Sequence, residues 1–411
     1  MSAEAVGIES VGFYVPRYFV DMRRLAAARG ADPDKYVHGL GQHKMCVAPP
    51  DEDVVTMGAS AAHLALRDVD ESEIDSVFFA TESGVDQSKA AAIYVHRLLG
   101  LPSACKTVEF KQACASSTVA LLAARALVAS GMDRKVLVVA ADVARYELGS
   151  PGEPTQGAGA VALVVSRQPR IMSLEEGHGA HTEDVMDFWR PNYRREALVD
   201  GKYSIKVYIR SLCEAWKRYH AATGRAFADH QRFCYHLPFT RMAEKAHAHL
   251  VVTATGKHAA REEMGRHIDA GLVYNREIGN TYTASLYIAL CSLLENEELP
   301  ASGRIGMFAY GSGCLGIFFS GLLTAGYREF LHREEHLRQL RERTELSVAE
   351  YERMYHFRLP EDGRRFEVPV HRTGPFRLAG VENHQRIYEG TRPRVRPDTQ
   401  SQHPVAAETT C

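Results

Sequence analysis

The sequence predicts a layered α/β protein, and two features of the chain support this prediction. Short apolar runs alternate with helical patterns through the first half of the chain. Several of these runs are apolar without interruption, for example Val136–Ala141 and Ala160–Val165. Because such strands are usually covered on both faces of their sheet, the core is expected to have several layers.

The elements of the first half follow one another in order. Strands are predicted at Ser76–Ala80, Thr107–Phe110 and Lys135–Ala140, with helices at Ala90–Leu99 and directly after Cys114. This order is typical of strands that lie in one sheet and are connected by helices.

A second run of the same kind appears later in the chain. A small-residue helix opens in Gly279–Leu290, and a strand follows at Arg304–Ala309. Two halves of similar plan are therefore expected, with a boundary near residues 167–180 and domains of 1–170 and 171–394.

Two segments of the C-terminal part are expected to lie outside the core. Mixed charges over Arg328–Arg353 predict one solvated helix. Residues 395–411 are rich in polar residues and carry too little apolar surface to offset the entropy of ordering, so a disordered tail is predicted.

The composition is that of an ordinary soluble protein with a large core. Of 411 residues, 45% are hydrophobic, and 49 Lys and Arg balance 51 Asp and Glu. No overall field attracts nucleic acid or an anionic membrane, so neither partner is expected. The N-terminus lacks the pattern of a signal peptide, and no apolar stretch approaches the roughly 18 residues of a membrane span. A cytoplasmic location is expected.

The cysteines include one candidate nucleophile. All 8 are scattered without a Cys-x-x-Cys pair, and a chain of this size needs no disulfides, so reduced thiols are expected. Cys114 lies between a predicted strand and an alanine-rich helix. Backbone N–H groups at a helix start carry partial positive charge and stabilise a thiolate. For an isolated cysteine, however, a buried structural role is the more common case.

Three further segments are candidates for the same site, although each has a simpler interpretation. Glu82 follows a buried-type strand at its carboxyl end, where α/β folds commonly build their sites, but it also suits an ordinary turn. His236 lies in the apolar run Phe233–Phe239, where a lone histidine is more often a core residue. The Gly-Ser-Gly turn at Ser312 has amides that can approach an oxyanion, or it is only a hairpin turn.

Together these four segments resemble, in order and spacing, the bacterial 3-hydroxy-3-methylglutaryl-CoA synthases, members of the thiolase-fold condensing enzymes. The resemblance runs from Val11–Pro16 to Glu382–Tyr388. Between these ends lie further similar segments: Ala80–Lys89, Thr155–Val161, Asp187–Tyr193 and Asp200–Ser204. The resemblance implies a five-layer αβαβα fold made from the two half-domains, and a homodimer.

The resemblance also implies a reaction in three stages. Cys114 takes an acetyl group from acetyl-CoA, Glu82 removes a proton from its methyl group, and the enolate attacks the ketone of acetoacetyl-CoA. Water then hydrolyses the enzyme thioester. His236 would hydrogen-bond the acetoacetyl group, Asn280 would help to hold it, and the amides of Cys114 and Ser312 would form the oxyanion hole. This chemistry suits the residue types, because a thiolate attacks thioesters well and a carboxylate base gains strength when desolvated.

Four more residues are expected at the substrates. By the resemblance, Tyr146 and Asp187 contact substrate. Lys245 and Arg241, one turn apart if their segment is helical, either meet the CoA phosphates or lie on a solvated helix face.

CoA thioesters are the only small molecules that this reaction requires, so neither a metal nor an organic cofactor is expected. The one His-x-His pair, His247 and His249, is interpreted as surface, because alternate residues on a helix point apart.

The chain departs from the family pattern beside the proposed nucleophile. Ala115 stands where the family usually has an aromatic residue, and Cys314 and Ile317 replace residues that are more often Ser or Val and Glu. Either neighbouring side chains fill the space that the aromatic ring would occupy, or the acyl pocket is roomier than usual, and acyl selectivity stays open.

Two alternatives remain at this point. One is a relative that performs β-branching on chains carried by an acyl carrier protein, with the same chemistry and a different carrier. The other is an inactive scaffold that keeps the fold, against which the joint presence of Cys114, Glu82 and His236 argues. Ketoacyl synthases and thiolases fit less well, since they lack an acidic base equivalent to Glu82.

Overall fold

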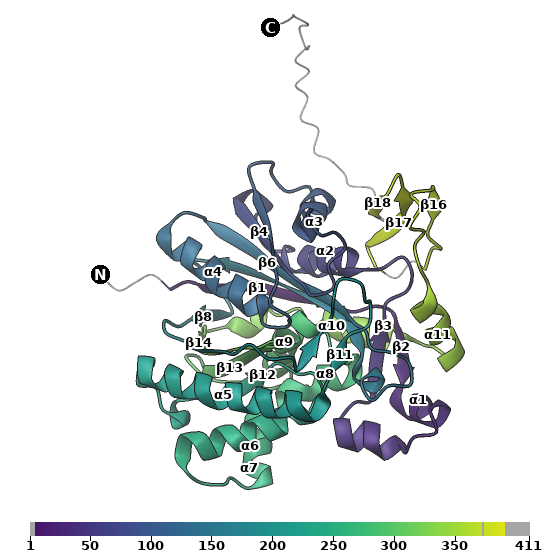
Figure 1. Ribbon diagram of the computed structural model, residues 1–411. Helices are drawn as coiled ribbons and strands as arrows, with labels where there is room; N and C mark the ends of the chain where they lie inside the picture. The colour runs from purple at the N-terminus through teal and green to yellow at the C-terminus, as the bar shows by residue number, and fades with distance from the viewer. Residues whose placement is uncertain (1–4, 372–373, 391–411) are drawn as a thin grey trace, which may run out of the picture.

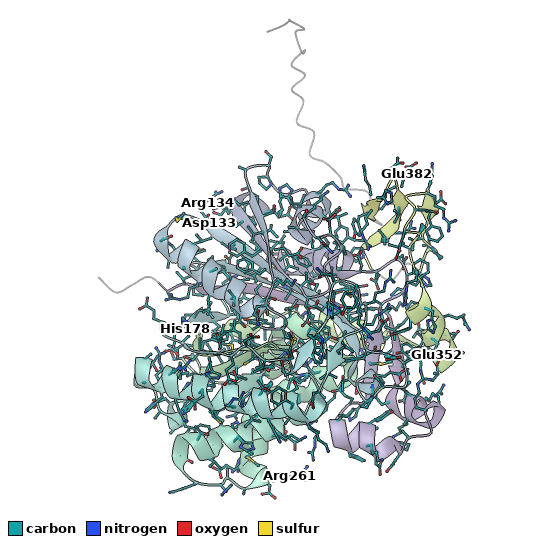
Figure 2. All side chains as sticks on the ribbon, in the orientation of Figure 1. Asp133, Arg134, His178, Arg261, Glu352 and Glu382 are labelled. Atoms are coloured by element: carbon teal, nitrogen blue, oxygen red, sulfur yellow. The ribbon has the colours of Figure 1, made fainter. Side chains whose placement is uncertain are left out.

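The structure is a computed structural model, and it describes residues 5–371 and 374–390 (Figure 1). The tail predicted at residues 395–411 lies outside the described residues. Figure 2 shows Arg134 at the upper left, Glu382 at the upper right and Arg261 at the bottom of the molecule. Charges of both signs are therefore spread over the surface, as the balanced composition predicts.

The N-terminal half contributes the strands β1-β7-β6-β4-β5, in that order, to the main sheet. β4 (Ile74–Ala80) runs parallel to β5 (Lys106–Phe110) and β6 (Lys135–Ala144). β7 (Gly157–Ser166) is antiparallel to β6 and to β1 (Gly7–Tyr14). The strands predicted in this half are therefore present, with somewhat wider bounds.

The C-terminal half repeats this arrangement. β12 (Arg232–Tyr235) is parallel to β13 (Arg304–Gly311), and β14 (Leu315–Leu323) is antiparallel to β13. β14 also pairs antiparallel with β8 (Met172–Leu174) and β9 (Gly179–Thr182). The order parallel, antiparallel, antiparallel is the order that β4, β6, β7 and β1 follow, so the second half has the plan that the sequence predicts.

Helices form the outer and central layers (Figure 1). α2 (Val54–Ala65) and α3 (Ala91–Leu99) cover the N-terminal half, and α5 (Gly201–Thr223) and α6 (Arg241–Thr255) cover the C-terminal half. α4 (Ser116–Ser130) and α9 (Ser285–Asn296) lie between, and one apolar core joins residues of both helices to strands of both halves. The layered α/β prediction is confirmed.

The remaining elements surround these layers. The helices are α1 (Met22–Ala28), α7 (Arg261–Ile268), α8 (Val273–Ile278), α10 (Arg333–Arg341) and α11 (Val348–His356). The strands are β2 (Tyr18–Asp21), β3 (Lys44–Val47), β10 (Phe188–Trp189), β11 (Leu198–Val199), β15 (Thr344–Glu345), β16 (Phe366–Glu367), β17 (Phe376–Glu382) and β18 (Gln385–Gly390). Short turns of 3₁₀ or π helix complete the chain, among them Lys35–Leu40 and Tyr282–Ala284.

The segment Ala113–Ser130 corrects the expectation that no apolar stretch approaches the length of a membrane span. Its length and composition are those of a spanning helix. It contains α4, whose residues Ala120, Leu121 and Ala124 are fully buried in the central core. A core helix of this kind meets the same criteria of length and composition, so the segment is no evidence of a membrane.

The single solvated helix predicted over Arg328–Arg353 is also wrong. Two helices, α10 and α11, are separated by β15, which pairs with β2. On α10, His336 is fully buried, accepts a hydrogen bond from Phe13 N at 2.9 Å and donates from Nδ1 to Glu295 at 2.7 Å. The charge pattern does not reveal this histidine, because its carboxylate partner comes from α9.

The His-x-His pair is only half on the surface. His249 is exposed, whereas His247 is buried and hydrogen-bonded to Tyr235 Oη at 2.8 Å and to His267 Nδ1 at 2.9 Å. Burial lowers the pKa of His247 to about 3. The two side chains point apart as expected, but His247 thereby faces the core and only His249 faces the surface.

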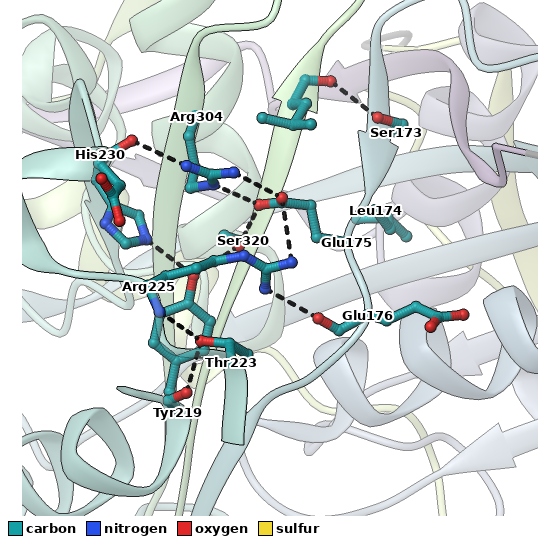
Figure 3. Close-up of polar contacts among 12 residues, drawn as sticks. Ser173, Leu174, Glu175, Glu176, Tyr219, Thr223, Arg225, His230, Arg304 and Ser320 are labelled. Atoms are coloured by element: carbon teal, nitrogen blue, oxygen red, sulfur yellow. Dashed lines mark hydrogen bonds and ion pairs between the residues drawn. The ribbon is translucent and has the colours of Figure 1, made fainter. Parts of the chain in front are cut away.

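A network of charged groups holds the C-terminal half together. Figure 3 shows Glu175 between Arg304 and Arg225, with Ser320 against its carboxylate. Arg304 donates to it at 2.8 and 3.0 Å, Ser320 Oγ donates at 2.6 Å, and Arg225 lies 3.2 Å away. Burial raises the pKa of Glu175, but the hydrogen bonds from Arg304 and Ser320 and the charge of Arg225 outweigh it, so this pKa lies below its ordinary value.

Candidate active site

A cavity of about 890 Å³ lies where the two halves meet. Cys114 lines it from the N-terminal half, and His236, Asn280 and Ser312 line it from the C-terminal half. The volume lies in the range that small-molecule sites occupy. Four of the residues singled out in the sequence therefore meet around one cavity, although they are far apart along the chain.

Cys114 lies in a sharp turn between β5 and α4. Ala113, the residue before it, has a φ of +43°, in the left-handed region that residues other than glycine rarely adopt. Gly311 at the end of β13 approaches this turn closely, since a Cβ there would lie 2.4 Å from Gln112 O and 2.9 Å from the Ala115 methyl. The nucleophile is thus set by a strained turn and a glycine from the other half of the chain.

The thiol of Cys114 donates a hydrogen bond to Glu82 Oε1 at 2.8 Å. Burial, and then the nearby Asp142 carboxylate, raise the pKa of Glu82 to about 8, although the thiol and the charge of Arg190 act in the opposite direction. Burial and the Glu82 charge raise the pKa of Cys114 well above its ordinary value. Burial therefore outweighs the helix-start effect, and the expected thiolate is corrected to a thiol that is hydrogen-bonded to Glu82.

Asp142, which sequence reasoning missed, connects Glu82 to the C-terminal half. Its fully buried carboxylate accepts hydrogen bonds from Thr81 Oγ1 and Glu82 N, both at 2.9 Å, and from Thr283 N at 3.1 Å and Thr283 Oγ1 at 2.5 Å. It fixes the backbone of Glu82 and places a second negative charge nearby. The signal for it was an aspartate among the apolar residues that follow Lys135 in strand β6.

His236 follows β12 and is held on several sides. Its N donates to Phe308 O at 2.8 Å, and its carbonyl accepts from Tyr208 Oη at 2.8 Å. Its ring Nδ1 lies 2.7 Å from Ser285 Oγ. Burial lowers the pKa of His236 to about 3, so the ring is neutral at physiological pH.

Asn280 is oriented by its own turn. Its Oδ1 accepts from Tyr282 N at 2.8 Å, and its backbone N donates to Thr155 O at 3.3 Å. The side chain lines the cavity, where its amino group is the polar atom left to meet a substrate.

The turn at Ser312 is anchored by Asp187 and Gln112. Asp187 is fully buried and accepts from Gly313 N at 2.9 Å and from Tyr310 Oη at 2.6 Å. Gln112 Nε2 donates to Ser312 O at 3.3 Å. Asp187 does not line the cavity, and its carboxylate holds the turn at Ser312 in place. Within the described residues, the amides of Ser312 and Cys114 donate to no backbone carbonyl, which leaves them for an oxyanion.

The outer part of the cavity has basic side chains. Lys245 lines it, whereas Arg241, the other expected phosphate ligand, is paired with Glu244 and does not. Arg194 and Lys202 also line the cavity and were missed. Arg194 lies in the loop between β10 and β11, and Lys202 lies in the first turn of α5. Tyr146 lines the cavity as expected.

The three residues that differ from the family pattern lie outside the cavity lining. Ala115, Cys314 and Ile317 are buried, and none of them lines the cavity. These positions pack in the core around the site, and the expectation of a roomier acyl pocket stays a prediction.

The seven described cysteines are all free thiols. Across residues 5–371 and 374–390, no group of three or more His, Cys, Asp or Glu is placed to hold a metal ion.

Comparison with known proteins identifies relatives along nearly the whole chain. The family model described as hydroxymethylglutaryl-coenzyme A synthase N terminal matches residues 2–169, and the C-terminal model matches residues 172–265 and 251–359. The chain is 45% identical to the hydroxymethylglutaryl-CoA synthase of Enterococcus faecalis over 351 residues, covering 85% of this chain and 91% of that protein. A crystal structure of HMG-CoA synthase complexed with CoA superposes with a TM-score of 0.89 at 40% identity, covering 94% of this chain and 100% of that one.

A carrier-dependent relative is less similar. A 3-hydroxy-3-methylglutaryl-ACP synthase of polyketide biosynthesis in Bacillus subtilis is 31% identical over 371 residues, covering 85% of this chain and 88% of that protein.

Proposed function

The chain belongs to the hydroxymethylglutaryl-CoA synthase family, and from that premise we propose how its own residues perform the family's reaction. The protein is a condensing acyltransferase that joins acetyl-CoA to acetoacetyl-CoA and yields 3-hydroxy-3-methylglutaryl-CoA and free CoA. The observation that carries the assignment of roles is the hydrogen bond of 2.8 Å between the Cys114 thiol and Glu82.

Cys114 is the nucleophile of the first step. Its sulfur attacks the acetyl carbonyl carbon of acetyl-CoA while its proton passes to Glu82 Oε1, 2.8 Å away. The amides of Cys114 and Ser312 stabilise the negative oxygen. The bond to the CoA sulfur then breaks, and the leaving thiolate takes the proton, which leaves acetyl-Cys114 and an ionised Glu82.

Glu82 is the base of the second step. Burial and the Asp142 charge raise its pKa to about 8, which makes the ionised carboxylate a stronger base than one in water. It removes a proton from the acetyl methyl, and the resulting carbon nucleophile attacks the ketone carbon of acetoacetyl-CoA. His236 and Asn280 hold that ketone from the opposite half, and water finally hydrolyses the bond to Cys114.

Acetoacetyl-CoA is favoured over a carrier-bound acceptor, since the CoA-using relative is 45% identical and the carrier-using relative 31%. We propose that Lys245, Arg194 and Lys202 meet the phosphates of CoA. The reaction so described uses no metal or organic cofactor. The cytoplasmic location stays a prediction.

We also propose that the protein is a homodimer. β5 ends the main sheet of the described chain and has no strand on its outer side. Val108 on β5 is 45% exposed, and Ile93 on the adjoining α3 is 43% exposed. An edge strand with apolar neighbours is a template for pairing, and β5 of a second copy would cover it.

The test is covalent labelling followed by turnover. Acetyl-CoA alone should add one acetyl group to the wild-type protein, located on the Cys114 peptide by mass spectrometry, and Cys114→Ala should carry none. Cys234→Ala is a control, because Cys234 is equally buried but lies outside the cavity. Acetoacetyl-CoA should then release 3-hydroxy-3-methylglutaryl-CoA. If Cys114→Ala carried as much acetyl label as the wild type, the assignment of Cys114 as the nucleophile would be wrong.

A further inference from the structure

The ring of His236 contacts the hydroxyl of Ser285, which has no role in the reaction steps described above. Ser285 is the first residue of α9 and is fully buried. Its Oγ lies 2.7 Å from His236 Nδ1, and it accepts a hydrogen bond from Leu237 N at 3.1 Å. The same hydroxyl therefore contacts both the ring of His236 and the backbone that follows it.

Counting protons assigns the direction of the bond between Ser285 and His236. A hydroxyl has one proton to donate. Leu237 N–H donates to Ser285 Oγ, so the hydroxyl proton is still to be placed, and the described residues offer Oγ no third partner. If His236 Nδ1 carried a proton and donated it to Oγ, the buried hydroxyl proton would have no acceptor, which is costly. With the hydroxyl donating to Nδ1, every group is satisfied.

The remaining ring nitrogen, Nε2, then carries the proton of the neutral imidazole. Among the described residues, Nε2 has no hydrogen-bond partner, and His236 lines the substrate cavity. The N–H is therefore left for a ligand.

The surroundings of the ring favour the neutral form. The His236 ring contacts the Ser285 hydroxyl and the ring of Tyr208, and within the described residues no hydrogen bond or ion pair joins it to a carboxylate. Ser285 lies in the first turn of α9, whose partial positive charge disfavours a cation nearby. A neutral N–H donor in such a place can stabilise a negative oxygen without being charged itself.

We propose that Ser285 is a positioning residue that holds His236 in its Nε2–H tautomer, so that a neutral imidazole donates a hydrogen bond to the ketone oxygen of the acceptor. The inference rests on the proposed function for the identity of the acceptor, but the tautomer itself is a property of the free protein.

A consequence for the condensation step follows. A neutral imidazole that keeps its Nε2 proton stabilises the alkoxide by a hydrogen bond and does not supply the proton that the alkoxide finally takes. Glu82 has just removed one proton from the acetyl methyl, so the two steps balance if that proton returns to the alkoxide oxygen. His236 then begins and ends the step in the same protonation state.

The tautomer is measured directly by nitrogen-15 NMR of histidine-labelled protein, with the His236 signals assigned by their loss in His236→Gln. We expect a protonated Nε2 and an unprotonated Nδ1 in the wild type at neutral pH. In Ser285→Ala, the single tautomer should give way to a mixture, whereas Ser285→Thr, which keeps the hydroxyl, should retain it. A protonated Nδ1 or an imidazolium in the wild type overturns the proposal.

Kinetics separate positioning from a general loss of structure. In Ser285→Ala, kcat/KM for acetoacetyl-CoA should fall roughly ten- to hundredfold, the usual worth of one hydrogen bond to a developing charge, while acetylation of Cys114 by acetyl-CoA keeps its rate. Ser292→Ala is the matched control. Ser292 lies on the same helix, is fully buried, accepts from Tyr274 N and donates to Ala270 O, yet it lies away from the cavity.

Equal losses of acetylation and condensation in Ser285→Ala, or the same acceptor defect in Ser292→Ala, would show a structural role and overturn the proposal. Failure of the proposed function would be seen differently. The wild type would then carry no acetyl group, or would make no product, and this result would not depend on the tautomer of His236. If Ser285→Thr fails to fold, the wild-type and Ser285→Ala spectra still decide.

Discussion

Glu82 and Cys114 show how much the surroundings of a residue decide its chemistry. A carboxylate in water is a weak base, and a thiol at a helix start would ordinarily lose its proton more easily. In this protein the two groups lie 2.8 Å apart in a largely desolvated site, and the pKa of each is raised. The pair is therefore prepared to move one proton between sulfur and oxygen, which a lone cysteine could not do.

Asp142→Asn tests the role of the buried charge. Glu82 acts as a base only when ionised, so the condensation rate should rise with pH through about 8 in the wild type. The Asp142 charge is one cause that raises this pKa, and its removal should shift the rise to lower pH. The measurement is kcat/KM for acetoacetyl-CoA against pH.

Asp133→Asn is the control for that shift. Asp133 is also buried and accepts a hydrogen bond from Ser76 Oγ at 2.6 Å, but it precedes β6, whereas Asp142 lies near the far end of that strand. Its substitution should leave the midpoint of the pH profile unchanged. An unchanged midpoint in Asp142→Asn as well would show that burial alone sets the basicity of Glu82.

At the scale of elements, the site depends on the close approach of β13 to the turn before α4. Ala115 belongs to this contact and not to the acyl pocket, since its methyl lies beside Gly311 and it does not line the cavity. Ala115 thus packs in the core where the two halves meet.

Gly311→Ala should separate the two elements and damage catalysis. An added Cβ would lie 2.4 Å from Gln112 O, so the turn that carries Cys114 must move. We expect Cys114 acetylation to slow roughly a hundredfold, since small displacements of reacting groups cost about that much.

Gly271→Ala is the matched control, because its nearest contact would be at 3.4 Å and it lies outside the cavity. It should acetylate at the wild-type rate. If Gly311→Ala also acetylated at that rate, the close approach would not matter for the nucleophile.

At the scale of the whole molecule, the fold brings its two halves together twice. The central helices α4 and α9 share one core, and β8 pairs with both β1 and β14, so the sheet runs through both halves. Asp142 reaches across the same boundary to Thr283. Stability and catalysis therefore depend on the same interface.

Glu175→Gln tests the network that holds the C-terminal half. The pKa of Glu175 is lower in the folded protein than in the unfolded chain, so its contribution to stability is present above its ordinary pKa of about 4.5 and is lost as pH falls through the folded value. The variant should lower the melting temperature at pH 7, and the difference from wild type should shrink below about pH 4.5. Calorimetry at several pH values checks this. A difference that is constant with pH would mean that the ionised form is unimportant.

Val108→Lys tests the proposed dimer. A lysine on an edge strand opposes pairing, so the variant should sediment as a monomer where the wild type sediments as a dimer. Val273→Lys is a suitable control, since Val273 is 39% exposed on α8, away from β5. A wild type that is monomeric at micromolar concentration would contradict the proposal outright.

Much of the fold could be predicted from the sequence because the signals are local. Uninterrupted apolar strands such as Val136–Ala141 and the repeat of helix and strand after Gly279 depend on neighbours in the chain. They indicated the layers and the two halves correctly. The resemblance then named Cys114, Glu82, His236 and Asn280, because these stand in short recognisable segments.

Tertiary structure decided what depends on partners far apart in the chain. Burial and the Glu82 carboxylate at 2.8 Å raise the pKa of Cys114, and burial keeps the His236 ring neutral beside Ser285. The buried His336 is hydrogen-bonded to Glu295. No local pattern records these pairs, so the sequence predicted a thiolate and a solvated helix that the fold does not contain. The sequence by itself determined which elements form and which residue types supply the chemistry. Their protonation, orientation and role in packing were decided only by folding, because burial and hydrogen bonding arise when distant segments meet.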